Sequence, residues 1–157
     1  MALVRILVDG YSLLHDWPEL APGMPRFSAA ARDELIQRLG AYQDTSHTPI
    51  TIFFDGSQPR GSRSSPGGPH PVEVLYSHQG QTADQMIERA AHRFREYGEV
   101  MAVTNDIAER ETVTSLGGLA CSCLNFINMV DGALVELRDE IKHHNLKERN
   151  RFNRRRQ

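Results

Sequence analysis

Acidic residues follow three apolar, strand-like runs of this chain. Asp9 closes the first run, Asp55 follows the second, and Asp106 follows a later one. A strand that ends in Asp-Gly is ordinarily a simple turn when it is taken alone. In a parallel sheet, however, the carboxyl ends of the strands face one crevice. Carboxylates about 4 Å apart repel by about 4 kcal/mol per pair at an effective dielectric near 20, so such a cluster favours a bound divalent cation.

A further acid is expected to join this crevice from the start of a helix. Thr82 is a suitable N-cap, which places Asp84 and Glu88 on one face in the first two turns. The alternative for Asp84 alone is a favourable interaction with the helix dipole. A carboxylate-bound Mg²⁺ or Mn²⁺ would suit phosphodiester cleavage, because the metal activates water and offsets charge in the transition state. Neither a P-loop nor a nucleophile elbow is found, so nucleotide-cofactor and serine-hydrolase chemistry lack support.

The elements that would position these acids alternate between strands and helices. Apolar runs predict strands at 3–8, 50–54, 72–76, 100–104 and 119–122, and helical periodicity predicts helices over about 29–43, 83–97 and 125–143. This alternation predicts a three-layer α/β domain with a Rossmann-like, mainly parallel sheet of about five strands. A long C-terminal helix and a basic tail complete the expected fold.

Length and composition are typical of one globular domain. The chain has 157 residues, of which 39% are hydrophobic and 24% charged. No apolar run approaches the roughly 20 residues of a membrane span, and the N-terminus enters a strand directly. We therefore expect a cytoplasmic protein without a membrane partner. Cys121 and Cys123 are expected to be buried, reduced thiols, because a C-x-C pair alone cannot complete a zinc site.

The net charge of −2 conceals an uneven distribution. Residues 142–157 hold seven basic residues and one acid, whereas residues 1–141 hold 11 basic and 19 acidic residues. We expect residues 1–141 to form the nuclease-like domain and residues 142–157 a basic tail. Either the tail binds a polyanion, or it is a solvated terminus that aids solubility.

Five short segments, taken in order, resemble a known family. They are Ile6-Leu7-Val8-Asp9-Gly10-Tyr11 with Leu13-Leu14, Phe53-Phe54-Asp55-Gly56, Val72-Glu73-Val74-Leu75-Tyr76-Ser77, Gly80-Gln81-Thr82-Ala83-Asp84 and Val103-Thr104-Asn105-Asp106. Together they resemble the YacP-like branch of the NYN domains, which belong to the PIN-like nuclease superfamily, over about residues 3–130. The resemblance implies a metal-dependent RNA-cleaving site built on Asp9, Asp84 and Asp106, with Asp55 as an outer carboxylate.

One position departs from the family pattern. The family has Asn after the Tyr of its first motif, whereas this chain has Ser12. A Ser hydroxyl has a shorter reach than an Asn amide, but it could orient Asp9 or hold a water on the metal. Ser12 therefore favours the rival hypothesis, a non-catalytic RNA-binding module that retains the fold, while the complete set of aspartates favours the enzyme.

The hypothesis that follows is an endoribonuclease that uses Mg²⁺ or Mn²⁺. Ser12, Asp55 and Glu88 are expected around the metal ligands, and Tyr11 either stacks on a base or packs under the first loop. The RNA backbone is expected to meet cationic residues of one loop and of the tail: Arg60, Arg63, Lys147, Arg149, Arg151, Arg154, Arg155 and Arg156. The expected partner is RNA, including translation-associated RNA on the ribosome. The sequence leaves the oligomeric state open.

Overall fold

A five-stranded sheet, in which every pair of neighbouring strands is parallel, forms the centre of the protein. We describe it from a computed structural model that covers residues 3–56 and 72–155. The strands are β1 (Leu3–Asp9), β2 (Ile50–Phe54), β3 (Glu73–Tyr76), β4 (Glu99–Val103) and β5 (Leu119–Cys121). Their order is β3-β2-β1-β4-β5, so β1 is central and the strand order reverses between β1 and β4. In open α/β sheets, this reversal is where ligands bind.

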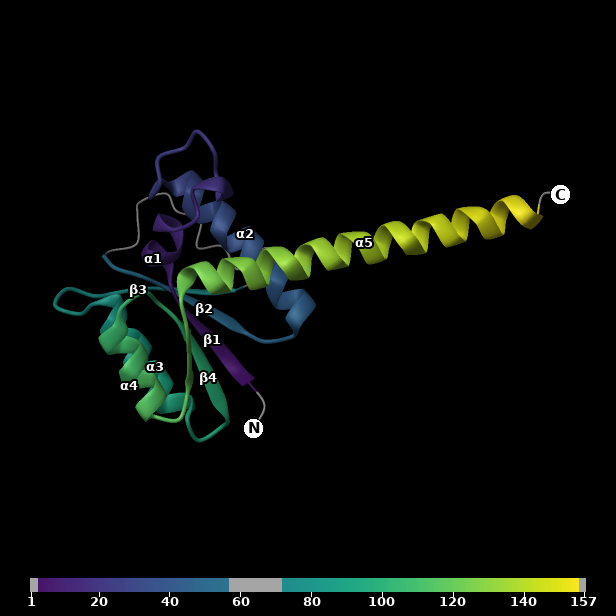
Figure 1. Ribbon diagram of the computed structural model, residues 1–157. Coiled ribbons are helices and arrows are strands. Elements are labelled where there is room, and N and C mark those ends of the chain that lie inside the picture. The colour runs from purple at the N-terminus through teal and green to yellow at the C-terminus, as the bar shows by residue number, and fades with distance from the viewer. Residues whose placement is uncertain (1–2, 57–71, 156–157) are drawn as a thin grey trace.

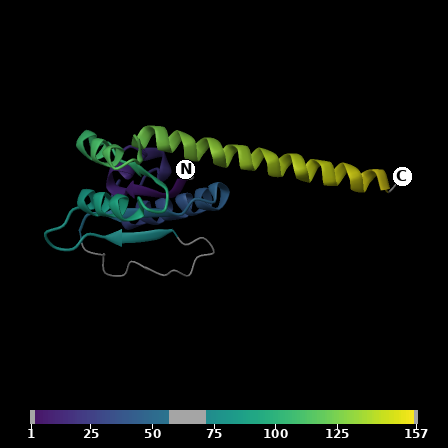
Figure 2. The same ribbon diagram turned by 90° about the horizontal axis from the view of Figure 1, so that it is seen from below.

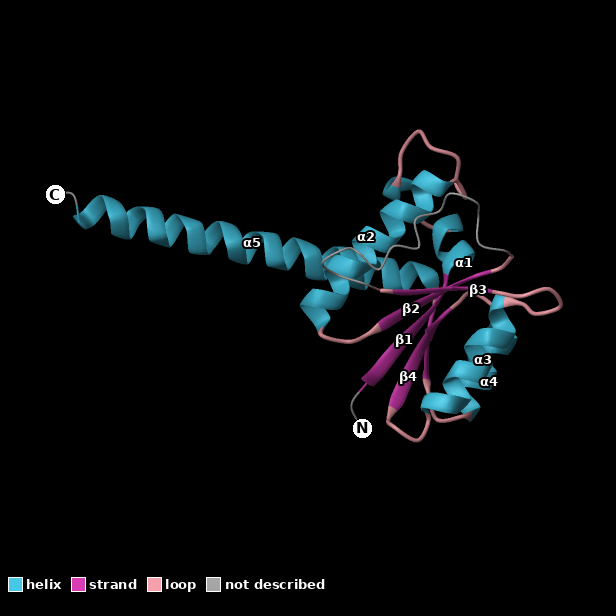
Figure 3. Cartoon of the chain, turned by 180° about the vertical axis from the view of Figure 1, so that it is seen from behind, coloured by secondary structure: helices cyan, strands magenta, loops and turns pink. Residues whose placement is uncertain are grey.

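Helices cover both faces of the sheet (Figures 1 and 3). The short helix α1 (Gly10–His15), α2 (Ala29–Ser46) and the start of α5 (Cys123–Arg155) lie on one face. Helices α3 (Ala83–Phe94) and α4 (Ile107–Ser115) cover the other face. Two hydrophobic clusters result, one on each side of the sheet, and every residue of β2 is buried. This explains why the strands are almost continuously apolar in sequence.

The expected α/β fold and its parallel sheet are confirmed, but several helices differ from the sequence predictions. Helices α1 and α4 and the 3-10 helix η1 (Pro18–Leu20) were not predicted, because segments of three to nine residues give little periodic signal. The predicted loop with Arg60 and Arg63 falls within 57–71, and Arg156 falls at the C-terminus. All three lie outside the described residues.

Helix α5 is much longer than expected and extends away from the domain (Figure 2). The prediction that it ends near residue 143 was wrong, because it continues without a break to Arg155. No Gly or Pro occurs after Gly132, so the sequence contains no stop signal. Every residue from 135 to 155 is exposed, and we call this part of α5 the arm. No helix in the described ranges is long and apolar enough to cross a membrane.

Candidate metal centre

Three carboxylates from three different elements meet at the carboxyl end of the sheet. Asp9 ends β1, Asp84 lies in the first turn of α3, and Glu109 lies in the first turn of α4. Each offers one oxygen, and these oxygens lie within 4.8 Å of one another. Among the described residues, this is the one group of at least three acidic, histidine or cysteine side chains close enough to hold a metal ion. It includes two of the three predicted ligands, and the third member is Glu109 instead of Asp106.

Asp9 is held in place by the residue that departs from the family pattern. Its Oδ2 accepts a hydrogen bond from Ser12 Oγ at 2.9 Å, and its Oδ1 accepts one from Ser12 N at 3.4 Å, as the N-cap of α1. Burial raises the pKa of Asp9, the two Ser12 bonds oppose this shift, and the charges of Asp84 and Asp55 add to it. Ser12 therefore orients Asp9, which is one of the two roles expected for it.

Gly10 lets helix α1 begin directly after Asp9. A Cβ added at this position would overlap the ring of Phe54 from the neighbouring strand. Since that ring is fully buried, only a residue without a side chain fits. The Asp-Gly pair is therefore more than a turn, because Gly10 sets the close approach of α1 to β2.

Asp84 is positioned through the N-terminus of α3, which two caps stabilise. Thr82 and Gln85 form a capping box. Asp55 Oδ1 accepts hydrogen bonds from Ala83 N at 2.6 Å and from Ser77 Oγ at 3.5 Å. Asp55 thus lies outside the ligand group and holds the turn that carries Asp84, close to the outer role expected for it.

Glu109 is a residue that the sequence predictions missed. Its side chain is 2% exposed, its Oε2 accepts from Thr104 Oγ1 at 3.5 Å, and its Oε1 has no hydrogen-bond partner among the described residues. Burial, then the close approach of the Asp84 carboxyl group and the charges of Asp84, Asp9 and Asp106, raise the pKa of Glu109 to about 9. A proton shared with Asp84, or a cation, would satisfy this carboxylate.

Asp106 lies next to the cluster and has a structural contact of its own. It is exposed, and its Oδ1 accepts from Glu109 N at 3.3 Å as the N-cap of α4. The spacing Asp106-x-x-Glu109 is that of an N-cap and its N3 residue. This spacing indicates that an acid lies in the first turn of the helix, but it does not indicate that the acid is buried. The predicted metal-binding role of Asp106 stays a prediction.

The remaining predicted residues lie around this centre or far from it. Glu88 is half-buried on α3 and is not in the ligand group. Tyr11 packs with its ring edge on Phe54, 5.0 Å between centroids, and on Phe27, so it is at least a packing residue. On the arm, Nη1 of Arg151 lies 3.4 Å from Oε1 of Glu148 and forms an ion pair with it. Exposed basic residues of the arm are Lys147, Arg149, Arg151, Arg154 and Arg155.

The donor set fits a hard divalent cation. All three groups offer carboxylate oxygens, which Mg²⁺ and Mn²⁺ prefer, and the buried Oε1 of Glu109 lacks a partner. The thiols are no part of the cluster: Cys123 is buried, and burial raises its pKa to about 12. The expected burial holds for Cys123, whereas Cys121 is only half-buried.

Comparison with known proteins identifies the family. The sequence model of the YacP-like NYN domain matches residues 6–157. The chain belongs to this family. NYN domains are PIN-like nucleases, and the acidic cluster described above lies in such a fold.

Relatives of this NYN protein come from Bacillus subtilis. The "Uncharacterized protein YacP" of strain 168 is 28% identical over 127 residues, which are 80% of this chain and 74% of that protein. The crystal structure of the W164L mutant of Rae1 (YacP) matches with a TM-score of 0.75 and 25% identity, covering 91% of this chain and 84% of the other. Another crystal structure of Rae1 (YacP) matches with a TM-score of 0.74 and 23% identity, over 94% and 84%.

Proposed function

We propose that this NYN protein is an endoribonuclease that uses Mg²⁺ or Mn²⁺ to hydrolyse RNA phosphodiester bonds. The observation that supports the proposal is the convergence of Asp9, Asp84 and Glu109 at the point where the strand order reverses. Three acids on separate elements cost free energy when they are brought together without a counter-ion. Glu109 adds to this cost, because its carboxylate is buried and one oxygen has no partner.

The protein's own residues hold the reaction site in place. Ser12 fixes both oxygens of Asp9, and Asp55 caps the turn that carries Asp84. Asp106 caps the helix that brings Glu109 to the same point. A bound divalent cation would supply Lewis-acid chemistry there, polarising the phosphate and lowering the pKa of water. A strand end and the capped first turns of two helices suit this task, because small displacements of metal ligands reduce activity strongly.

RNA is the proposed substrate, and the arm is the proposed site for its backbone. Beyond Lys142, the arm carries five exposed basic residues within the described range and one acid, Glu148. Arginine and lysine bind phosphates independently of sequence, so the arm should contribute affinity that depends on salt. Arg60, Arg63 and Arg156 are proposed to act in the same way. A cytoplasmic location and delivery of translation-associated RNA on the ribosome are part of the same proposal.

The decisive experiment is cleavage of total RNA and of a defined single strand, with Mn²⁺ and with EDTA. We expect cleavage only with the metal, and expect Asp9→Asn and Glu109→Gln each to abolish it. Glu96→Gln is the matched control, because this exposed acid follows α3 at the opposite end of the sheet. The proposal is wrong if the wild type shows no metal-dependent cleavage, or if Glu96→Gln loses as much activity as Glu109→Gln.

The same assay distinguishes the rival function, a non-catalytic RNA-binding module. That rival predicts bound RNA that remains intact with Mn²⁺. The replacement of the family Asn by Ser12 was the reason to consider it. Because Ser12 donates to Asp9 through both its hydroxyl and its backbone N–H, the replacement retains a group that orients the ligand.

A further inference from the structure

An exposed aromatic ring lies near the metal centre without an assigned role. Phe27 is 47% exposed and lies on the segment between η1 and α2. Its ring meets Tyr11 edge to face, with centroids 5.5 Å apart and planes at 87°. Tyr11 in turn contacts Phe54, 5.0 Å away, and is two residues from Asp9. Phe27 is thus the outer end of a row of rings that begins beside a metal ligand.

Two arginines lie close to Phe27, one next to it in the chain and one bonded to its backbone. Arg26 precedes it and is exposed. The Nη1 of Arg32, on the first turns of α2, donates to the carbonyl oxygen of Phe27 at 2.8 Å, which fixes the backbone that carries the ring. An exposed aromatic ring beside guanidinium groups is the combination that single-stranded nucleic acids bind, since bases stack on the ring and phosphates pair with the cations.

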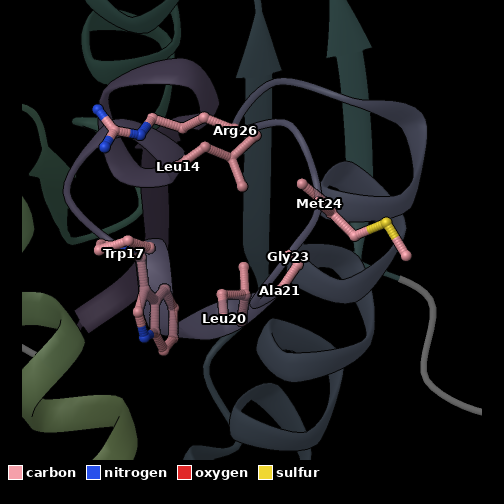
Figure 4. Close-up of a pocket in the computed structure, with 9 residues that line it drawn as sticks. Leu14, Trp17, Leu20, Ala21, Gly23, Met24 and Arg26 are labelled. Atoms are coloured by element: carbon pink, nitrogen blue, oxygen red, sulfur yellow. The ribbon is translucent and has the colours of Figure 1, made fainter.

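The same segment borders a hollow of about 340 Å³ (Figure 4). Leu14, Trp17 and Leu20 surround it, and Met24 and Arg26 lie at its margin. This volume is at the small end of the range for ligand pockets, and its walls are mainly apolar. Because Arg26 lines the hollow and precedes Phe27 in the chain, the hollow adds apolar surface to the segment that carries the ring.

We infer that Phe27 stacks on one unpaired base of the RNA substrate, with Arg26 directed to an adjoining phosphate. This inference rests on the proposed function and narrows its substrate class to RNA with unpaired bases near the cleaved bond. A base inside a duplex has both faces covered by its neighbours, so it cannot offer a face to Phe27. A row of rings that starts beside the metal ligands, flanked by cations, favours the nucleic-acid substrate over a protein partner.

The test compares Phe27→Ala, Phe27→Trp and the matched control Tyr97→Ala. Tyr97 is 73% exposed and lies between α3 and β4, at the opposite end of the sheet. Affinity is measured in EDTA for one RNA sequence as a single strand, as a duplex, and as a single strand of equal length without its bases. Thermal unfolding confirms that each variant is folded.

We expect Phe27→Ala to weaken binding of the single strand roughly 5- to 100-fold, the loss of one stacked base. Phe27→Trp should retain the affinity for the single strand, and Tyr97→Ala should not change it. For the duplex and for the base-free strand, Phe27→Ala and the wild type should have the same affinity. Unchanged affinity of Phe27→Ala for the single strand, or an equal loss with the base-free strand, overturns the inference. Cleavage by the wild type with Mn²⁺ is scored separately, so a failure of the proposed function remains distinguishable.

Discussion

Glu109→Gln should make the metal-free protein more stable at neutral pH. In the folded protein the pKa of Glu109 is raised to about 9, chiefly by burial, whereas its ordinary value is 4.5. The folded state therefore keeps a proton that the unfolded chain releases above pH 4.5. The stability contributed by this group is fully present below pH 4.5 and is lost as the pH rises toward 9. Glutamine is neutral in both states and avoids this loss.

The size of the effect at pH 7 follows from the unfolded chain. Neutral pH is about 2.5 units above the ordinary pKa, and each unit corresponds to about 1.4 kcal/mol, so protonating Glu109 costs up to about 3.5 kcal/mol of folding free energy. At pH 5.5 the same reasoning gives about 1 kcal/mol. The amide of glutamine can also donate to Asp84 in place of the shared proton. The gain in stability should therefore increase with pH.

Urea unfolding in EDTA at pH 5.5, 7 and 8 measures this difference, with Glu96→Gln as the exposed control. Adding Mn²⁺ should reverse the order, since the wild type gains stability by binding the ion and the variant has lost a ligand. The reasoning is refuted if Glu109→Gln is no more stable than the wild type at pH 8 in EDTA. Such a result would mean that Glu109 is already ionised in the folded protein without metal.

Three further predictions concern the arm, the first turn and the buried thiol. Deleting residues 147–157 should weaken RNA binding and flatten its salt dependence, whereas single-turnover cleavage at saturating RNA should be retained. Loss of cleavage at saturating RNA would show that the arm is part of the active site. Gly10→Ala should destabilise the fold by about 1–3 kcal/mol in urea unfolding, because its Cβ overlaps the ring of Phe54, and a wild-type midpoint would contradict this. Cys123, with its pKa of about 12, should resist iodoacetamide at pH 8 in the native protein, as followed by mass spectrometry; modification at the rate of the unfolded chain would show that it is accessible.

The sheet and part of the candidate site could be predicted from the sequence because their signals are local. Each strand is a short apolar run, and Asp9 follows directly from the end of one of them. The position of Asp84 in the first turn of a helix could be predicted because Thr82 is a typical N-cap residue. Both predictions needed only the rule that the carboxyl ends of parallel strands share one edge.

Glu109 could not be predicted in this way, because its burial is a tertiary property. On a nine-residue helix, an acid at the third position is ordinarily an exposed residue that favours the helix dipole. Only the packing of α4 against β5 and α3 turns this position inward. The place of Asp106 just after a strand predicts a metal ligand, and the structure adds that this residue is exposed and caps α4. The end of α5 could not be predicted from the basic composition of residues 142–157, because a charged segment without Gly or Pro can continue a helix.

The arm has a consequence for local stability. From Val135 to Arg155 the helix has no buried residue, so its backbone hydrogen bonds depend on helix propensity and on charge. Arginines three and four positions apart repel, and this repulsion is offset in part by their place near the helix C-terminus and by the Arg151–Glu148 pair. We therefore expect the helix–coil equilibrium of the arm to lie closer to the coil than that of the rest of α5, so its amide hydrogens should exchange with solvent far faster than those from Cys123 to Leu134. A polyanion that neutralises these charges would shift that equilibrium toward helix, so binding and ordering of the arm would be thermodynamically linked.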